Sequence, residues 1–191
     1  MPRVFLSYRK SDSVYATAAV ADRVARQFGQ ENVFRDRDSL PLGVAYPRRI
    51  LSVLERSDIV LALVGAAWLD VRDGAGRRRL DDPEDWVRME LRMAFEREIP
   101  VVPVLLDGTP MPEARLLPAD IAALNLSTYW HVRHQSFESD VRGLIRGLTG
   151  DGERPPSAPE PQAGQNVQHN QSNGSGPFFA NQGHQIINGR P

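Results

Sequence analysis

The residue with the clearest chemical potential is a glutamate set among apolar residues. Apolar spacing predicts a helix over residues 84–98. Around this helix, at about 100° per residue, Trp86 and Ala94 lie within about 40° of Glu90, and Val87 lies within about 60°. A carboxylate in the middle of an apolar arc costs free energy unless it is paired, hydrogen-bonded or open to a cleft. The pattern leaves two interpretations open: a functional carboxylate in a cleft, or a structural glutamate paired with an arginine.

Other common reactive groups are missing from the sequence. The chain has no cysteine, which excludes a thiol nucleophile, a disulfide and a zinc–thiolate site. There is no Gly-x-Gly-x-x-Gly fingerprint after the first predicted strand, no Walker loop and no Gly-x-Ser-x-Gly elbow. His131 and His134 lack the partners of a metal site and are expected at the surface. The sequence therefore favours a carboxylate as the reactive group and predicts no metal.

The elements that must position these residues alternate between strands and helices. Apolar runs predict strands at 4–6, 32–34, 59–64, 99–106 and 128–130. Helical spacing predicts helices at 14–28, 46–54, 84–98 and 137–148, with Pro83 at the start of the third. Pro100 and Pro103 predict a bulge or an edge-like start for the fourth strand. The order implies an open parallel sheet with helices on both faces, whose ligands lie beyond the carboxyl ends of the strands.

Composition divides the chain near residue 150. The 191 residues are 41% hydrophobic and 25% charged, with a net charge of −1. Residues 1–149 are enough for one domain with its own core. Residues 150–165 are rich in proline, glycine, alanine and glutamine, which predicts a linker. Residues 166–191 predict a polar tail that is either disordered or a small β-rich segment.

Charge and hydropathy restrict the expected partners and location. The balanced charge disfavours non-specific nucleic-acid binding, and Arg77 to Arg79 fit a solvated loop better than a phosphate-binding patch. The longest apolar run, Ile59 to Leu69, is too short to cross a bilayer, so no membrane partner is expected. The first residues lack the layout of a signal peptide, and a cytoplasmic location is expected.

Several motifs, in order and at compatible spacing, resemble the Toll/interleukin-1 receptor (TIR) domain in its bacterial form. They are Val4 to Asp12 (VFLSYRKSD), the loop Asp36 to Gly43, Ser57 to Leu61 (SDIVL), and Trp86 to Leu91 (WVRMEL) followed by Ile99 to Val104. Leu117 to Asp120 and the closing amphipathic helix are also similar. The resemblance covers residues 1–149. It implies an α/β, flavodoxin-like three-layer fold with a five-stranded parallel sheet.

The resemblance implies one of two functions. Many members cleave the nicotinamide–ribose bond of NAD+ and release nicotinamide with ADP-ribose or a cyclic isomer, in signal transduction or antiphage defence. For such a member NAD+ is the substrate and no further cofactor is needed. Other members are non-catalytic scaffolds that bind other TIR domains or themselves, here through the loop 36–46.

The resemblance also implies site residues. Catalytic members carry a Trp-x-x-x-Glu pattern, which Trp86 and Glu90 match, so Glu90 is the expected catalytic residue. A cationic nicotinamide needs little acid help to leave, and one carboxylate that stabilises the oxocarbenium-like ribose is sufficient. The expected substrate-binding residues are Ser7, Tyr8, Arg9, Asp36, Asp38, Gly43, Trp68 and Trp86. Within this set, Arg9 is a candidate phosphate contact, and Trp68 is either a wall of the pocket or a core aromatic.

Overall fold

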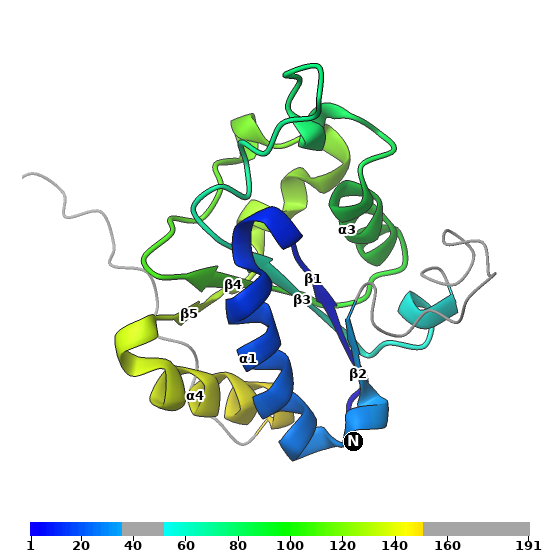
Figure 1. Ribbon diagram of the computed structural model, residues 1–191. Helices are drawn as coiled ribbons and strands as arrows, with labels where there is room; N and C mark the ends of the chain where they lie inside the picture. Colours follow the sequence, from blue (N-terminus) through cyan, green and yellow to red (C-terminus); the bar gives the residue numbers. More distant parts are fainter. Residues whose placement is uncertain (36–51, 151–191) are drawn as a thin grey trace, which may run out of the picture. The chain divides into compact units, whose positions relative to one another are not determined.

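Five parallel strands form the centre of the molecule (Figure 1). The structure is a computed structural model that describes residues 1–35 and 52–150. The strands are β1 (Val4–Ser7), β2 (Val33–Arg35), β3 (Ile59–Val64), β4 (Val101–Leu106) and β5 (Trp130–Val132). Their order in the sheet is β2-β1-β3-β4-β5, with every pair parallel. This is the flavodoxin-like doubly wound order, which confirms the predicted fold class.

Helices cover both faces of this sheet because its strands are apolar on both sides. Helices α1 (Lys10–Phe28) and α4 (Phe137–Thr149) lie on one face, as Figure 1 shows. Helix α3 (Trp86–Glu96) and the 3₁₀ helix Ala119–Leu126 cover the other. Strand residues alternate between the two layers: Val60 points toward α3, and its neighbour Leu61 points toward α1. The run that is apolar on both faces is therefore a central strand, as predicted.

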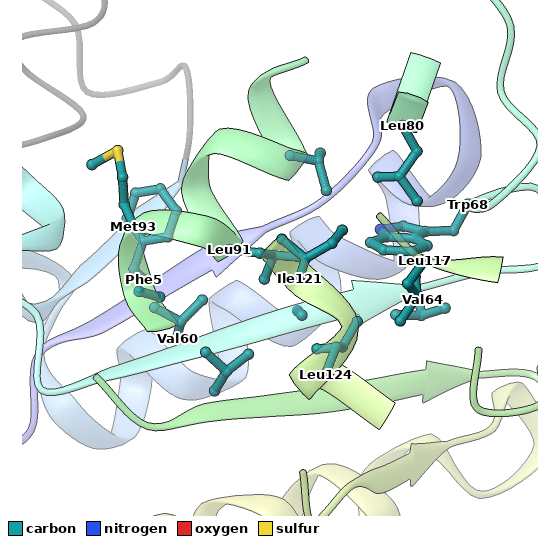
Figure 2. Close-up of a cluster of buried hydrophobic side chains, with 14 of the residues drawn as sticks. Phe5, Val60, Val64, Trp68, Leu80, Leu91, Met93, Leu117, Ile121 and Leu124 are labelled. Carbon is teal, nitrogen blue, oxygen red and sulfur yellow. The ribbon is translucent and has the colours of Figure 1, made fainter. Parts of the chain in front are cut away.

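The core beneath α3 is the layer that holds the candidate site. Figure 2 shows Phe5, Val60 and Leu91 meeting between the sheet and α3, with Trp68 and Leu80 at the other end of the cluster. These side chains are almost completely buried. Their packing fixes α3 against β1 and β3, so a side chain on the sheet-facing side of α3 is held in one place.

The structure differs from the sequence prediction at several element ends, the largest shift being the start of α1 at Lys10 instead of residue 14. Helix α3 begins at Trp86, because the Asp85 side chain caps it by accepting a hydrogen bond from the Arg88 N–H at 3.1 Å; Pro83 precedes the helix. Strand β4 begins at Val101, directly after Pro100, and lies inside the sheet in regular register with β3, with Pro103 opposite Ala62 rather than at a bulge. One proline removes only one ladder donor, and the apolar run on both sides of it keeps the strand in the sheet. The last strand begins at Trp130, the final residue of the predicted run.

No helix among residues 1–35 and 52–150 is long and apolar enough to span a membrane. The loop 36–46, the predicted linker after Gly150 and the predicted tail 166–191 lie outside the described residues.

Candidate active site

A hydrogen bond joins the end of the first strand to the glutamate singled out by the sequence. Ser7 is the last residue of β1, and its Oγ donates to Oε2 of Glu90 at 2.6 Å. Ser7 is completely buried and Glu90 is 1% exposed. The carboxylate thus lies at the carboxyl end of a parallel strand, where ligands of this sheet type are expected.

The position of Glu90 follows from the sequence of α3. Val87, Leu91 and Ala94 are buried against the sheet, and Glu90 lies on the same side of the helix. Helical side chains lean toward the helix N-terminus, so Glu90 is directed toward the turn that carries Trp86 and Val87. The apolar arc inferred from the sequence is real, and the glutamate lies inside it.

Arg9 lies close to this site and forms its ion pair with Asp85. Its Nη1 donates to Asp85 Oδ2 at 3.0 Å, and its Nη2 donates to Asp85 Oδ1 at 2.9 Å. Its Nε donates to the carbonyl oxygen of Trp68 at 2.9 Å, and the guanidinium carbon lies 5.8 Å from the Trp68 ring centroid. The side chains of Arg9 and Asp85 are 4% and 1% exposed. Protein groups thus occupy the guanidinium, which braces the end of β1 against the start of α3; Arg9 also lines the cavity described below, and its expected role as a phosphate contact stays a prediction.

Asp85 is the residue that sequence reasoning missed. It caps α3, pairs with Arg9 and lies 3.4 Å from Nε of Arg79. The sequence prediction began the helix at residue 84, which placed Asp85 on the solvent side. An aspartate directly before the first apolar residue of a helix is a recognised start signal, and that signal identifies Asp85 as a cap.

A cavity of about 190 Å³ opens beside Trp86. Its lining comprises Tyr8, Arg9, Lys10, Ser11, Arg79, Asp85, Trp86 and Val87. A second cavity of about 450 Å³ shares Arg79, Asp85 and Trp86, and the rest of its lining comes from residues 72–84 of the loop before α3. With Arg9 and Asp85 paired, Lys10 and Arg79 leave an excess of positive charge around the smaller cavity. The two cavities meet at Trp86, one helical turn from Glu90.

The expected site residues therefore divide into three groups. Ser7, Tyr8, Arg9, Trp86 and Glu90 come together between the ends of β1 and α3. Trp68 was expected to be either a wall of the pocket or a core aromatic, and the structure places it in the core, 1% exposed within the cluster of Figure 2. It contacts the site through Arg9. Asp36, Asp38 and Gly43 lie outside the described residues.

The histidines take no part in this arrangement. His131 lies in β5 and His134 in the 3₁₀ turn before α4, so they do not share a helical face. Both are exposed. Within the described parts of the chain, no group of three or more His, Cys, Asp or Glu residues is arranged to hold a metal ion.

Comparison with known proteins agrees with the fold. Among solved structures, the chain is similar to the TIR domains of the activated Roq1 resistosome, which directly recognizes the pathogen effector XopQ. The sequence identity is 13% and the TM-score 0.54, over 79% of this chain and 99% of that chain. At this identity the likeness shows the fold alone. A family model described as "TIR domain" matches residues 4–144, most of the chain, and the protein therefore belongs to the TIR domain family.

Proposed function

We propose that this TIR domain cleaves the nicotinamide–ribose bond of NAD+, with Glu90 as the catalytic residue. The observation that carries the proposal is the buried Glu90 carboxylate, held by Ser7 one helical turn from a cavity that Trp86 lines. Family membership and the Trp-x-x-x-Glu pattern at Trp86 support it. Because fold alone does not define activity, the proposal rests on this site.

The proposed reaction breaks the bond between C1′ of the ribose and the pyridinium nitrogen. The bonding electron pair leaves with nicotinamide, which becomes neutral, and positive charge develops on the ribose. The Glu90 carboxylate stabilises that charge electrostatically. Water then adds at C1′ and releases a proton, giving ADP-ribose, or a ring nitrogen of the adenine adds instead and gives a cyclic isomer.

The neighbouring residues have distinct proposed roles. Ser7 is a positioning residue, because its hydroxyl holds Oε2 and so fixes the direction of the carboxylate. Trp86 offers an apolar surface for the nicotinamide or ribose. Lys10 and Arg79, which line the same cavity, are the cations available to the diphosphate. The smaller cavity has the size of a fragment of the dinucleotide, and the adjoining one supplies further volume.

The test measures nicotinamide released from NAD+ by the purified full chain at high protein concentration. Glu90→Gln keeps the size of the side chain and removes its charge, and is expected to reduce release by about a hundredfold or more. Glu96→Gln is the matched control, because Glu96 is exposed near the end of the same helix. If the unaltered protein releases no nicotinamide, or if Glu90→Gln releases as much as the unaltered protein, the proposal of NAD+ cleavage by Glu90 is rejected.

The burial of Glu90 at 1% exposure favours a second candidate, a non-catalytic scaffold that self-associates or binds other TIR domains. In this case Glu90 serves only to tie α3 to β1. The likeness to TIR domains within a resistosome is in keeping with assembly. The scaffold predicts that Pro41 or Gly43 substitutions reduce oligomer size in light scattering, whereas Glu90→Gln leaves it unchanged. Loss of nicotinamide release in Glu90→Gln at unchanged oligomer size would identify the enzyme instead.

Both candidates place the protein in signal transduction or antiphage defence within the cytoplasm. Infection of cells carrying the unaltered protein or the Glu90→Gln variant tests this placement. If the protein is an NAD+-cleaving defence protein, infection lowers cellular NAD+ in cells that carry the unaltered protein. It does not do so in cells that carry the Glu90→Gln variant.

A further inference from the structure

We propose that the groove between α1 and α4 binds an acidic peptide segment of a partner protein. The groove lies on the face of the sheet opposite α3 and Glu90, where α4 passes close to the second half of α1 at a steep angle (Figure 1). It encloses about 420 Å³. It is therefore independent of the proposed NAD+ site, and a failure of one proposal does not affect the other.

The charge of the groove is strongly one-sided. Four arginines line it, Arg23 and Arg26 from α1 and Arg142 and Arg146 from α4, against the single carboxylate of Glu138. These lining residues carry an excess of three positive charges in a chain whose net charge is −1. Four guanidinium groups around one small groove are expected to attract an anionic ligand.

Two of these arginines have no ion pair with any residue that the structure describes. Arg23 pairs with Glu138, and Arg26 pairs with Asp22 of the preceding helical turn at 2.8 Å. The side chains of Arg142 and Arg146 form no ion pair or hydrogen bond within residues 1–35 and 52–150, and both residues are exposed. Spaced four residues apart on α4, they point to the same side of the helix. Their guanidinium forks are available for carboxylate groups of a ligand.

The shape of the groove favours a peptide over a nucleotide. Its α4 side runs from Glu138 to Thr149, a rise of about 16 Å along the helix, which matches about five residues of extended chain. Ile145, which is half-buried, supplies apolar surface between the charged residues. The lining contains no aromatic side chain on which a base could stack. An extended segment that alternates acidic and apolar residues fits this combination.

The test uses a fluorescein-labelled peptide of alternating glutamate and leucine, titrated with the full chain and followed by fluorescence anisotropy. Arg142→Gln/Arg146→Gln is expected to weaken binding about tenfold. The control Arg77→Gln/Arg115→Gln removes the same charge from two exposed arginines outside the groove and is expected to change binding less than about twofold. Binding to the unaltered chain is expected to weaken with added salt. Failure of the peptide to bind, or equal weakening in both double variants, would overturn the proposal.

Two further measurements separate the other possible occupants. Inorganic pyrophosphate and ATP are titrated as competitors, and tighter binding of either one than of the peptide overturns the assignment in favour of a phosphate site. The full chain carrying Asp151→Asn/Glu153→Gln tests whether the acids that follow α4 in sequence fill the groove. A tenfold gain in peptide affinity in this variant would mean that the chain's own acids occupy the groove, and would overturn the proposal of a partner peptide. Unchanged affinity would support the partner peptide.

Discussion

The guanidinium of Arg9 and the carboxylate of Asp85 face each other as a buried, two-pronged ion pair between the end of β1 and the start of α3. Asp85 also caps α3, so this one pair fixes where the helix that carries Glu90 begins. A buried pair of this kind adds little over apolar residues, but the loss of one partner leaves the other charge uncompensated.

Arg9→Met is therefore expected to lower the free energy of unfolding by about 3–5 kcal/mol, because the buried Asp85 then loses both hydrogen bonds from Arg9 and keeps only its longer contact with Arg79. Arg9→Met/Asp85→Leu is expected to recover part of this loss, although it removes the helix cap. Urea denaturation followed by circular dichroism measures both variants. A single variant as stable as the unaltered protein would show that the pair does not hold α3.

The Ser7 hydroxyl is expected to act through Glu90. Ser7→Ala removes the donor to Oε2 and is expected to cost about 1–3 kcal/mol of stability, because a buried carboxylate oxygen loses its hydrogen bond. If Glu90 is catalytic, kcat for nicotinamide release falls while KM changes little.

A second buried serine provides the control for Ser7. Ser57→Ala removes a hydrogen bond from Oγ to the carbonyl oxygen of Val53, well away from Glu90. It is expected to reduce stability without changing kcat, whereas Ser7→Thr is expected to restore activity because it keeps the hydroxyl. Equal effects of Ser7→Ala and Ser57→Ala on kcat would show that Ser7 does not act by positioning Glu90.

Gly65 is expected to tolerate no side chain, because Asp12 occupies the space beside it. The Asp12 carboxylate accepts hydrogen bonds from the Gly65 N–H at 2.9 Å and the Ala67 N–H at 2.8 Å, which ties the start of α1 to the end of β3. A Cβ at Gly65 would lie 2.5 Å from Asp12 Oδ2. Gly65→Ala is therefore expected to cost about 1–3 kcal/mol.

The matched control is Gly147→Ala in α4, where a Cβ meets no atom within 4 Å. It is expected to stabilise the protein by about 0.5–1 kcal/mol, since alanine is the better helix residue. Thermal unfolding measures both variants. If Gly65→Ala is as harmless as Gly147→Ala, the Asp12 contact does not constrain this loop.

The sequence was sufficient for the fold because its signals are local. The apolar run Ile59–Val64 predicts a central strand, and the alternation of strands and helices predicts the parallel sheet. Helix and strand ends shifted by about one to four residues, as at Lys10 for α1 and at the Asp85 cap for α3. Such ends depend on single hydrogen bonds, which apolar periodicity does not reveal.

The candidate site could be predicted only in part. The periodicity of α3 identified Glu90, because a carboxylate in an apolar arc is visible in the sequence itself. The pairing of Arg9 with Asp85 joins residues 76 positions apart, and nothing in the sequence selects Asp85 over the other acids. The structure thus adds to Arg9 the role of a brace that the sequence did not predict, and the Ser7 contact explains how Glu90 is held.

Asp140 is expected to make stability depend on pH in acid. Its pKa lies at about 2, below the ordinary value of 3.8, chiefly because the Arg133 side chain donates to it; the Arg133 N–H and the Ser136 hydroxyl add to this lowering, and burial partly opposes it. Because the folded state holds the proton less tightly than the unfolded chain, Asp140 contributes stability above about pH 4, which is lost as the pH falls toward 2. With Arg133 60% exposed, solvent screening limits the contribution to about 1 kcal/mol.

Urea denaturation at several values of pH between about 2 and 6 tests this contribution. Asp140→Asn keeps the size of the side chain but cannot titrate, so its free energy of unfolding is expected to fall less steeply with acid than that of the unaltered protein. As the pH falls toward 2, the difference between the two proteins is expected to narrow, because the unaltered Asp140 then becomes protonated in a growing fraction of the molecules. Asp107→Asn is the control, since Asp107 is an exposed aspartate that accepts the His134 N–H near the same end of the sheet. Parallel pH curves for the unaltered protein and Asp140→Asn would show that the contact with Arg133 does not stabilise the junction between β5 and α4.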